Sequence, residues 1–126
     1  MGYVIRFPQL DAVFVDRRKL AVLRRAHGAR VAEAHVLRRL RSIHATLAAM
    51  RLLHRLGEGG ALATLARRLS AHAAQIGLTT LARAARDVAI CAQSGDRVAF
   101  AAVWARLNRS AARSVHRLWM QADLRV

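Results

Sequence analysis

The chain has 126 residues, which is enough for one domain with one modest core. Hydrophobic residues make up 55% of it and proline occurs once, so the composition argues against a disordered chain and favours helices. The net charge of +15 suggests an acidic partner, which could be nucleic acid, an anionic membrane or an acidic protein.

The first half of the chain predicts two helices after a short arm. Residues 1–15 are a mixed segment that we expect to form an extended arm or a turn of helix. Asp16 can act as an N-cap, and a short helix is expected from there to Gly28, a residue type that commonly ends helices. Nothing interrupts a long helix over residues 29–56. Its apolar stripe recurs at steps of three and four residues and consists of Val36, Leu40, Ile43, Leu47 and Met50.

A glycine-rich connection at residues 57–60 predicts a hairpin between antiparallel helices. The next helix is expected over residues 61–76, where Gly77 ends it. Thr79 or Thr80 could cap the helix that follows. The stripe of the helix over 61–76 consists of Leu62, Leu65, Leu69, Ala73 and Ile76.

The last two helices complete the predicted domain. Gly95 is expected to end the helix that begins near Thr79 or Thr80, and Asp96 is expected to cap the last helix. Residues 121–126 are expected to fray. Four substantial helices with short connections predict an all-α fold, an antiparallel up-down four-helix bundle with a short N-terminal capping helix. No linker is visible, so residues 1–126 are expected to form a single domain.

Residues 66–77, with the sequence ARRLSAHAAQIG, resemble the central motif of histidine-phosphotransfer (HPt) domains. In that family a helix carries His-x-x-Lys-Gly, followed by small residues and a turn glycine. When the final Ile-Gly pair is aligned, Arg67 stands at the phospho-accepting histidine, Ser70 at the lysine and Ala71 at the glycine. The resemblance implies a module of two-component phosphorelays that lacks its phosphorylatable residue. The likeness in layout extends to the flanking segments 14–20, 77–85 and 94–96.

Arg67 is expected to face outward. At about 100° per residue it lies almost opposite the apolar stripe of its helix, among small residues that let another protein approach closely. The resemblance implies a receiver domain as the partner, because HPt domains dock receivers with this face. The expected partner-binding residues are Ala63, Arg67, Arg68, Ser70, Ala71 and Ala74. A solvated alanine-rich face and a homodimer seam are the alternatives for the same surface.

We expect a binding protein and not an enzyme. An arginine side chain stays protonated and cannot accept a phosphoryl group at neutral pH. Neither Cys-x-x-Cys nor His-Glu-x-x-His occurs, so no metal or cofactor is expected. Cys91 is the single cysteine, which excludes an internal disulfide and fits a cytoplasmic location. No apolar run is long enough to span a bilayer, so no membrane partner is expected.

Two other functions remain as alternatives. The first is phosphotransfer through a displaced histidine, either His72, five residues after Arg67, or His54 near the hairpin. We interpret His72 as a boundary histidine, because the wheel puts it beside the core stripe. The second is a nucleic-acid-binding helical protein. The charge supports it, but the arginines occur on every helix and no aromatic-basic interleaving appears.

Overall fold

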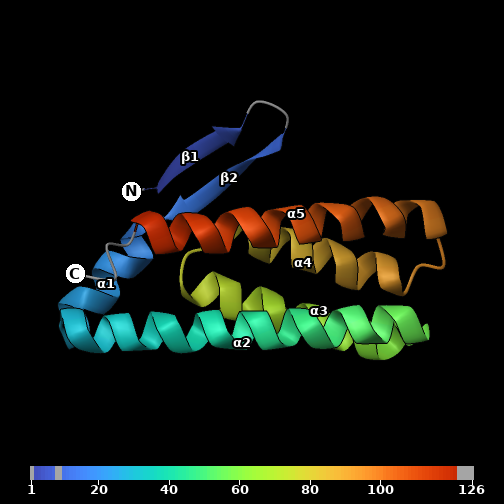
Figure 1. Ribbon diagram of the computed structural model, residues 1–126, viewed down its shortest axis with the longest axis horizontal. Coiled ribbons are helices and arrows are strands. Elements are labelled where there is room, and N and C mark those ends of the chain that lie inside the picture. The colour runs from blue at the N-terminus through green and yellow to red at the C-terminus, as the bar shows by residue number, and fades with distance from the viewer. Residues whose placement is uncertain (1, 8–9, 122–126) are drawn as a thin grey trace.

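The computed structural model describes the backbone of residues 2–7 and 10–121, and the side chains of residues 16–114 and 116. The fraying expected for residues 121–126 concerns positions that, after 121, lie outside the described residues. Two strands come first in the described part of the chain, β1 (Gly2–Phe7) and β2 (Leu10–Asp16), and helices follow (Figure 1). The expected helical character is confirmed, with one addition at the N-terminus. The described helices are α1 (Arg17–His27), α2 (Ala29–Leu56), α3 (Gly59–Gln75), α4 (Thr79–Ala92) and α5 (Arg97–Gln121).

The addition is a β-hairpin formed by the segment that we expected as an arm. β1 and β2 pair antiparallel, with Tyr3 opposite Val15 and Ile5 opposite Val13. Both strands are rich in β-branched and aromatic residues, which favour extended backbone over helix. Of the two alternatives for this segment, the helical turn is wrong and the extended arm is right. The term all-α therefore describes the helices from α1 onward but not residues 2–16.

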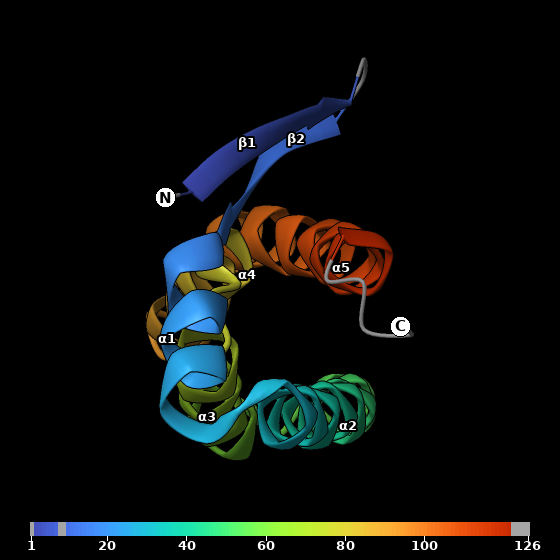
Figure 2. The same ribbon diagram turned by 90° about the vertical axis from the view of Figure 1, so that its left-hand side faces the viewer.

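Consecutive long helices pack side by side and run in alternating directions (Figure 1). Seen along their axes, α2, α3, α4 and α5 follow one another around an arc, so that α2 and α5 form its two ends (Figure 2). Two leucines of α1, Leu20 and Leu23, pack against the core from outside this arc. Among the described residues, no helix is long and apolar enough to cross a membrane.

The ends of the helices follow the expected caps in most places. Asp16 accepts a hydrogen bond from the backbone N–H of Arg18 at 3.0 Å, and Asp96 accepts one from Ala99 at 3.0 Å. The predicted threonine cap of α4 is wrong, because Leu78 precedes the helix and no side chain caps it. Leu78 is fully buried, so apolar packing positions this turn. α3 begins at Gly59, two residues earlier than predicted.

The core is built from the predicted stripe of α2 and from alanine-rich contacts between α3 and α4. All five stripe residues of α2 are buried, and so are four of the five predicted on α3, with Leu65 half-buried. Small side chains let two helix backbones come close together, and each buried contact adds dispersion attraction. The buried alanines that α3 and α4 contribute are Ala63, Ala66, Ala73, Ala82, Ala84, Ala85 and Ala89.

The turn between α3 and α4 is tied to the start of α1. The backbone N–H of Asp16 donates to the carbonyl oxygen of Gly77 at 2.7 Å. Gly77 has a φ of +79°, a conformation that side chains with a Cβ adopt only at a cost. A Cβ at Gly77 would also lie 2.5 Å from the carbonyl oxygen of Asp16. This position therefore requires glycine for two reasons, the local conformation and the close approach of another segment.

We expect Gly77→Ala to lower the free energy of unfolding by about 1–3 kcal/mol, because the left-handed conformation and the contact with Asp16 both become strained. Gly60→Ala is the matched control. Gly60 lies in the first turn of α3 with nothing near its Cβ position, so alanine there should leave stability unchanged or raise it by up to about 1 kcal/mol. Urea unfolding followed by circular dichroism measures both variants. Equal stability of the two variants would contradict the junction described above.

Candidate partner-binding face on α3 and α4

Four of the six predicted partner-binding residues are exposed. Arg67, Arg68, Ala71 and Ala74 all lie on the solvent side of α3. The Arg67 Nη2 donates to Thr64 Oγ1 at 3.4 Å, a long bond within the same helix. No carboxylate pairs with this guanidinium among the described residues. Arg67 is therefore an exposed cation that a partner could engage.

The other two predicted residues, Ala63 and Ser70, are buried, so the outward position expected for them is wrong. Ala63 has no exposed surface and Ser70 keeps 7%. The hydroxyl of Ser70 donates to the carbonyl oxygen of Ala82 on α4 at 2.8 Å. The expectation failed because it centred the core on the leucines of α3, whereas α4 covers a second side. On a helical wheel with about 100° per residue, the centre of the buried residues of α3 lies about 60° closer to α4 than the centre of the predicted stripe.

Because the buried side of α3 is rotated toward α4, Arg67 lies at the edge of the exposed side, next to α4. The bond from Ser70 to Ala82 shows that these two residues lie at the same level of the two antiparallel helices. Arg67 lies about one turn before Ser70, and Arg86 lies about one turn after Ala82, so the two arginines stand at the same level of the structure. Ala63, which lies about one turn before Arg67, is fully buried and cannot contact a partner.

A hollow of about 200 Å³ lies beside Ala74, where α1, α3 and α4 meet. Three cations from two other helices line it, and among the described residues no carboxylate does. We group these cations with the exposed residues of α3 that lie toward α4, because Arg67 stands at the level of Arg86 and Ala74 lines the hollow itself. We call this group the basic α3–α4 face, and its members are Lys19, Arg67, Ala71, Ala74, Arg83 and Arg86.

Reasoning from the sequence missed Lys19, Arg83 and Arg86. A signal existed for two of them, because Arg83 and Arg86 are three residues apart, off the apolar stripe of α4, and the preceding hairpin brings that helix beside α3. The acids near these residues in the sequence are used elsewhere. Asp16 caps α1, and Asp87 lies 3.9 Å from Arg106 of α5. The positive charge of the face is therefore available to an acidic partner.

His72 is half-buried between α3 and α2, which confirms its expected boundary position. Arg39 Nη1 lies 3.1 Å from His72 Nδ1. A guanidinium only donates, so Nδ1 accepts and the ring proton is on Nε2. Burial lowers the pKa of His72 from its usual 6.5, and the positive charges of Arg39 and Arg68 lower it further. A neutral imidazole with its outer nitrogen protonated is poorly prepared to attack a phosphoryl group.

His54 is exposed at the end of α2 and its ring packs against two aromatic rings of α5. The ring centroids of His54 and Trp104 lie 4.7 Å apart, and those of His54 and Phe100 lie 5.4 Å apart. The ring thus joins the two ends of the helical arc, where Arg51 Nε also donates to Asn108 Oδ1 at 3.0 Å. Neither histidine considered as a displaced acceptor lies on the basic α3–α4 face.

Comparisons with protein-family models, curated proteins and solved structures gave no match. Among the described residues, no group of three or more His, Cys, Asp or Glu side chains gathers where a metal ion could bind.

Ser70→Lys would place a long cation at this buried position, and we expect it to lower the free energy of unfolding by more than about 2 kcal/mol. The ammonium of the introduced lysine could not stay in the buried position beside α4 without a large desolvation cost. The hydrogen bond that the Ser70 hydroxyl donates to Ala82 would also be lost. Ala71→Lys is the control, because Ala71 is adjacent to Ser70 but exposed, and lysine there should change the free energy of unfolding by no more than about 0.5 kcal/mol. Chemical denaturation compares the two. A fully stable Ser70→Lys protein would contradict the burial of this position.

The lowered pKa of His72 predicts a loss of stability in acid. As the pH falls below 6.5, the unfolded chain takes up this proton before the folded chain does, so the free energy of unfolding decreases until the folded pKa is passed. His72→Gln removes the titration and keeps an acceptor for Arg39. We expect the variant to lose less stability than wild type between pH 7.5 and about 5.5. His44→Gln, at an exposed position of α2, controls for the substitution.

Proposed function

We propose that this chain is an HPt-like signalling module that binds a receiver domain through the basic α3–α4 face without accepting phosphate. In this proposal the helices form the antiparallel up-down four-helix bundle of that family, with α1 as its N-terminal cap. The observation that carries the proposal is Arg67, an exposed cation at the motif position of the phospho-accepting histidine. The motif resemblance over residues 66–77 supports the choice of partner.

The chemistry of the face suits the phosphorylation pocket of a receiver, which is acidic. A guanidinium can donate two parallel hydrogen bonds to a carboxylate or to phosphoryl oxygens. Arg67 would supply such a pair, and Lys19, Arg83 and Arg86 would surround it with positive charge. Ala71 and Ala74 present no long side chain, so the partner backbone can approach α3 closely.

The same residue that favours binding prevents transfer. A histidine can hold a phosphoryl group and pass it on, whereas an arginine keeps its proton and its charge. A receiver bound at Arg67 would therefore keep its phosphoryl group and be hidden from other partners. The proposed role is to sequester or scaffold a receiver.

Charge reversal tests the binding face. We expect Arg67→Glu and Arg86→Glu each to weaken binding of a receiver domain by about ten-fold or more, because each replaces an attraction to an acidic pocket with a repulsion. Arg41→Glu is the matched control, since it makes the same charge change on the exposed side of α2. Calorimetric titration against receivers, with and without a phosphoryl mimic, measures the affinities. Equal weakening by all three variants would indicate attraction by net charge alone.

Phosphoryl transfer is tested separately with labelled receivers. We expect no acid-labile phosphate on the wild-type chain, and we expect Arg67→His to gain it where the receiver binds. Label on the wild-type chain would contradict the proposal, and its loss in His72→Ala or His54→Ala would then identify the acceptor. The failure of every receiver to bind would remove the partner.

Duplex DNA provides the comparison with the alternative function. Contacts with phosphates predict an affinity that falls steeply with salt. Binding of DNA at physiological salt that exceeds the affinity for receivers, and that Arg41→Glu weakens as much as Arg67→Glu, would favour a nucleic-acid-binding protein. Weak DNA binding that disappears with salt is the result expected for a chain of net charge +15.

A further inference from the structure

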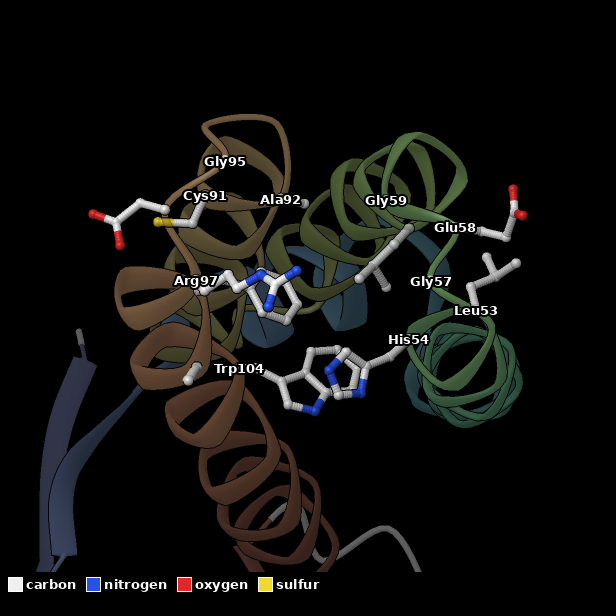
Figure 3. Close-up of a pocket in the computed structure, with 14 residues that line it drawn as sticks. Leu53, His54, Gly57, Glu58, Gly59, Cys91, Ala92, Gly95, Arg97 and Trp104 are labelled. Atoms are coloured by element: carbon white, nitrogen blue, oxygen red, sulfur yellow. The ribbon is translucent and has the colours of Figure 1, made fainter.

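A cavity of about 570 Å³ lies at the end of the structure where the α2–α3 and α4–α5 connections come together (Figure 3). Its size falls within the range of small-molecule sites, which is about 300–1,000 Å³. No member of the basic α3–α4 face lines it. The cavity is therefore separate from the face to which the function is assigned above.

One wall of the cavity is aromatic. The rings of His54, Phe100 and Trp104 are within 32° of parallel, with centroids 4.7–5.9 Å apart. The remaining surface is mainly apolar, with residues from α2, α3 and α4. Flat rings that offer their faces and edges favour a flat aromatic guest, which can stack against them or meet them edge-on. The apolar residues beside the rings are Leu53, Leu62, Cys91, Ala92 and Ala101.

The polar groups of the cavity favour a negative charge on that guest. Arg97 begins α5, and its guanidinium extends over the cavity in Figure 3. It has no carboxylate partner among the described residues. The two acids of the rim are turned to other uses: Asp96 caps α5 through Ala99, and the carboxylate of Glu58 points away from the cavity (Figure 3). Arg97 is thus the cation that remains to meet a guest.

We propose that this cavity binds a small organic acid with a flat aromatic body. The aromatic body lies against Trp104 and Phe100, and the carboxylate accepts hydrogen bonds from Arg97. Leu53 and His54 of α2 also line the cavity, so such a guest contacts both α2 and α5, the two ends of the helical arc, which touch at His54. Binding therefore stabilises the folded state, because the guest has no equivalent site in the unfolded chain.

Three probes of similar shape and different charge test the proposal on the full-length protein. Indole-3-acetate carries the carboxylate, indole-3-acetamide is neutral and tryptamine is a cation. We expect the acid to bind about ten-fold or more tightly than the amide, because a hydrogen bond to a charged group is stronger than one to a neutral group. Tryptamine should bind weakest. Calorimetric titration gives the affinities, and thermal unfolding should shift upward with the acid.

Two variants locate the binding. Arg97→Gln should reduce the affinity for the acid to that for the amide and leave the amide unchanged. Ala101→Phe, at an exposed position of the rim, should fill the space and weaken both ligands at least about five-fold without disturbing the core. Arg41→Gln removes a charge from the outside of α2 and should change neither affinity.

The proposal is overturned by any of three results. No binding of the acid at millimolar concentration would show that the cavity has no such guest. Equal affinity for acid and amide, or a preference for tryptamine, would show that Arg97 does not select an anion. An affinity for the acid that falls as much in Arg41→Gln as in Arg97→Gln would show attraction by the net charge of the chain. None of these results bears on receiver binding at Arg67, so the two proposals fail separately.

Discussion

The close packing of α3 against α4 is the constraint on which the other features of this structure depend. Buried alanines let the two helix backbones come close together, and only residues 76–78 separate the two helices in the sequence. The buried hydroxyl of Ser70 adds a directional contact, because its hydrogen bond to Ala82 requires these two residues to lie at the same level in one register. That register brings Arg67 level with Arg86 and puts the α3–α4 turn where Asp16 can donate to Gly77.

The helices could be predicted well, and the face only in part. The stripe of α2 recurs without interruption on a helix with one buried side, so periodicity alone identifies it. α3 is different because it is covered on two sides, and the leucines indicate only one of them. Ala63 and Ser70 were therefore placed outward, where the structure buries them against α4. Lys19 joins the face from a different helix, and the periodicity of a single helix does not predict which residues of other helices lie beside it.

The structure separates two kinds of chemistry on different parts of one short chain. The basic face carries four long cations around small side chains, which suits a macromolecular partner with an acidic surface. The cavity beside Trp104 is larger and mainly apolar, with one free cation at its rim among the described residues, which suits a small molecule. Arg67 and Arg97 thus have similar side chains and different surroundings, and the surroundings decide the class of ligand that each can select.

The junction between Asp16 and Gly77 has one more consequence, which concerns the chemistry of amines. It holds the start of α1 beside the turn that follows α3, and so it brings Lys19 to the rim of the basic face. Lys19 is the single lysine of the chain, and every other side-chain cation in the count of 22 is a guanidinium. Acylation of lysine is therefore directed to this one face, where it would remove a charge and leave every arginine unmodified.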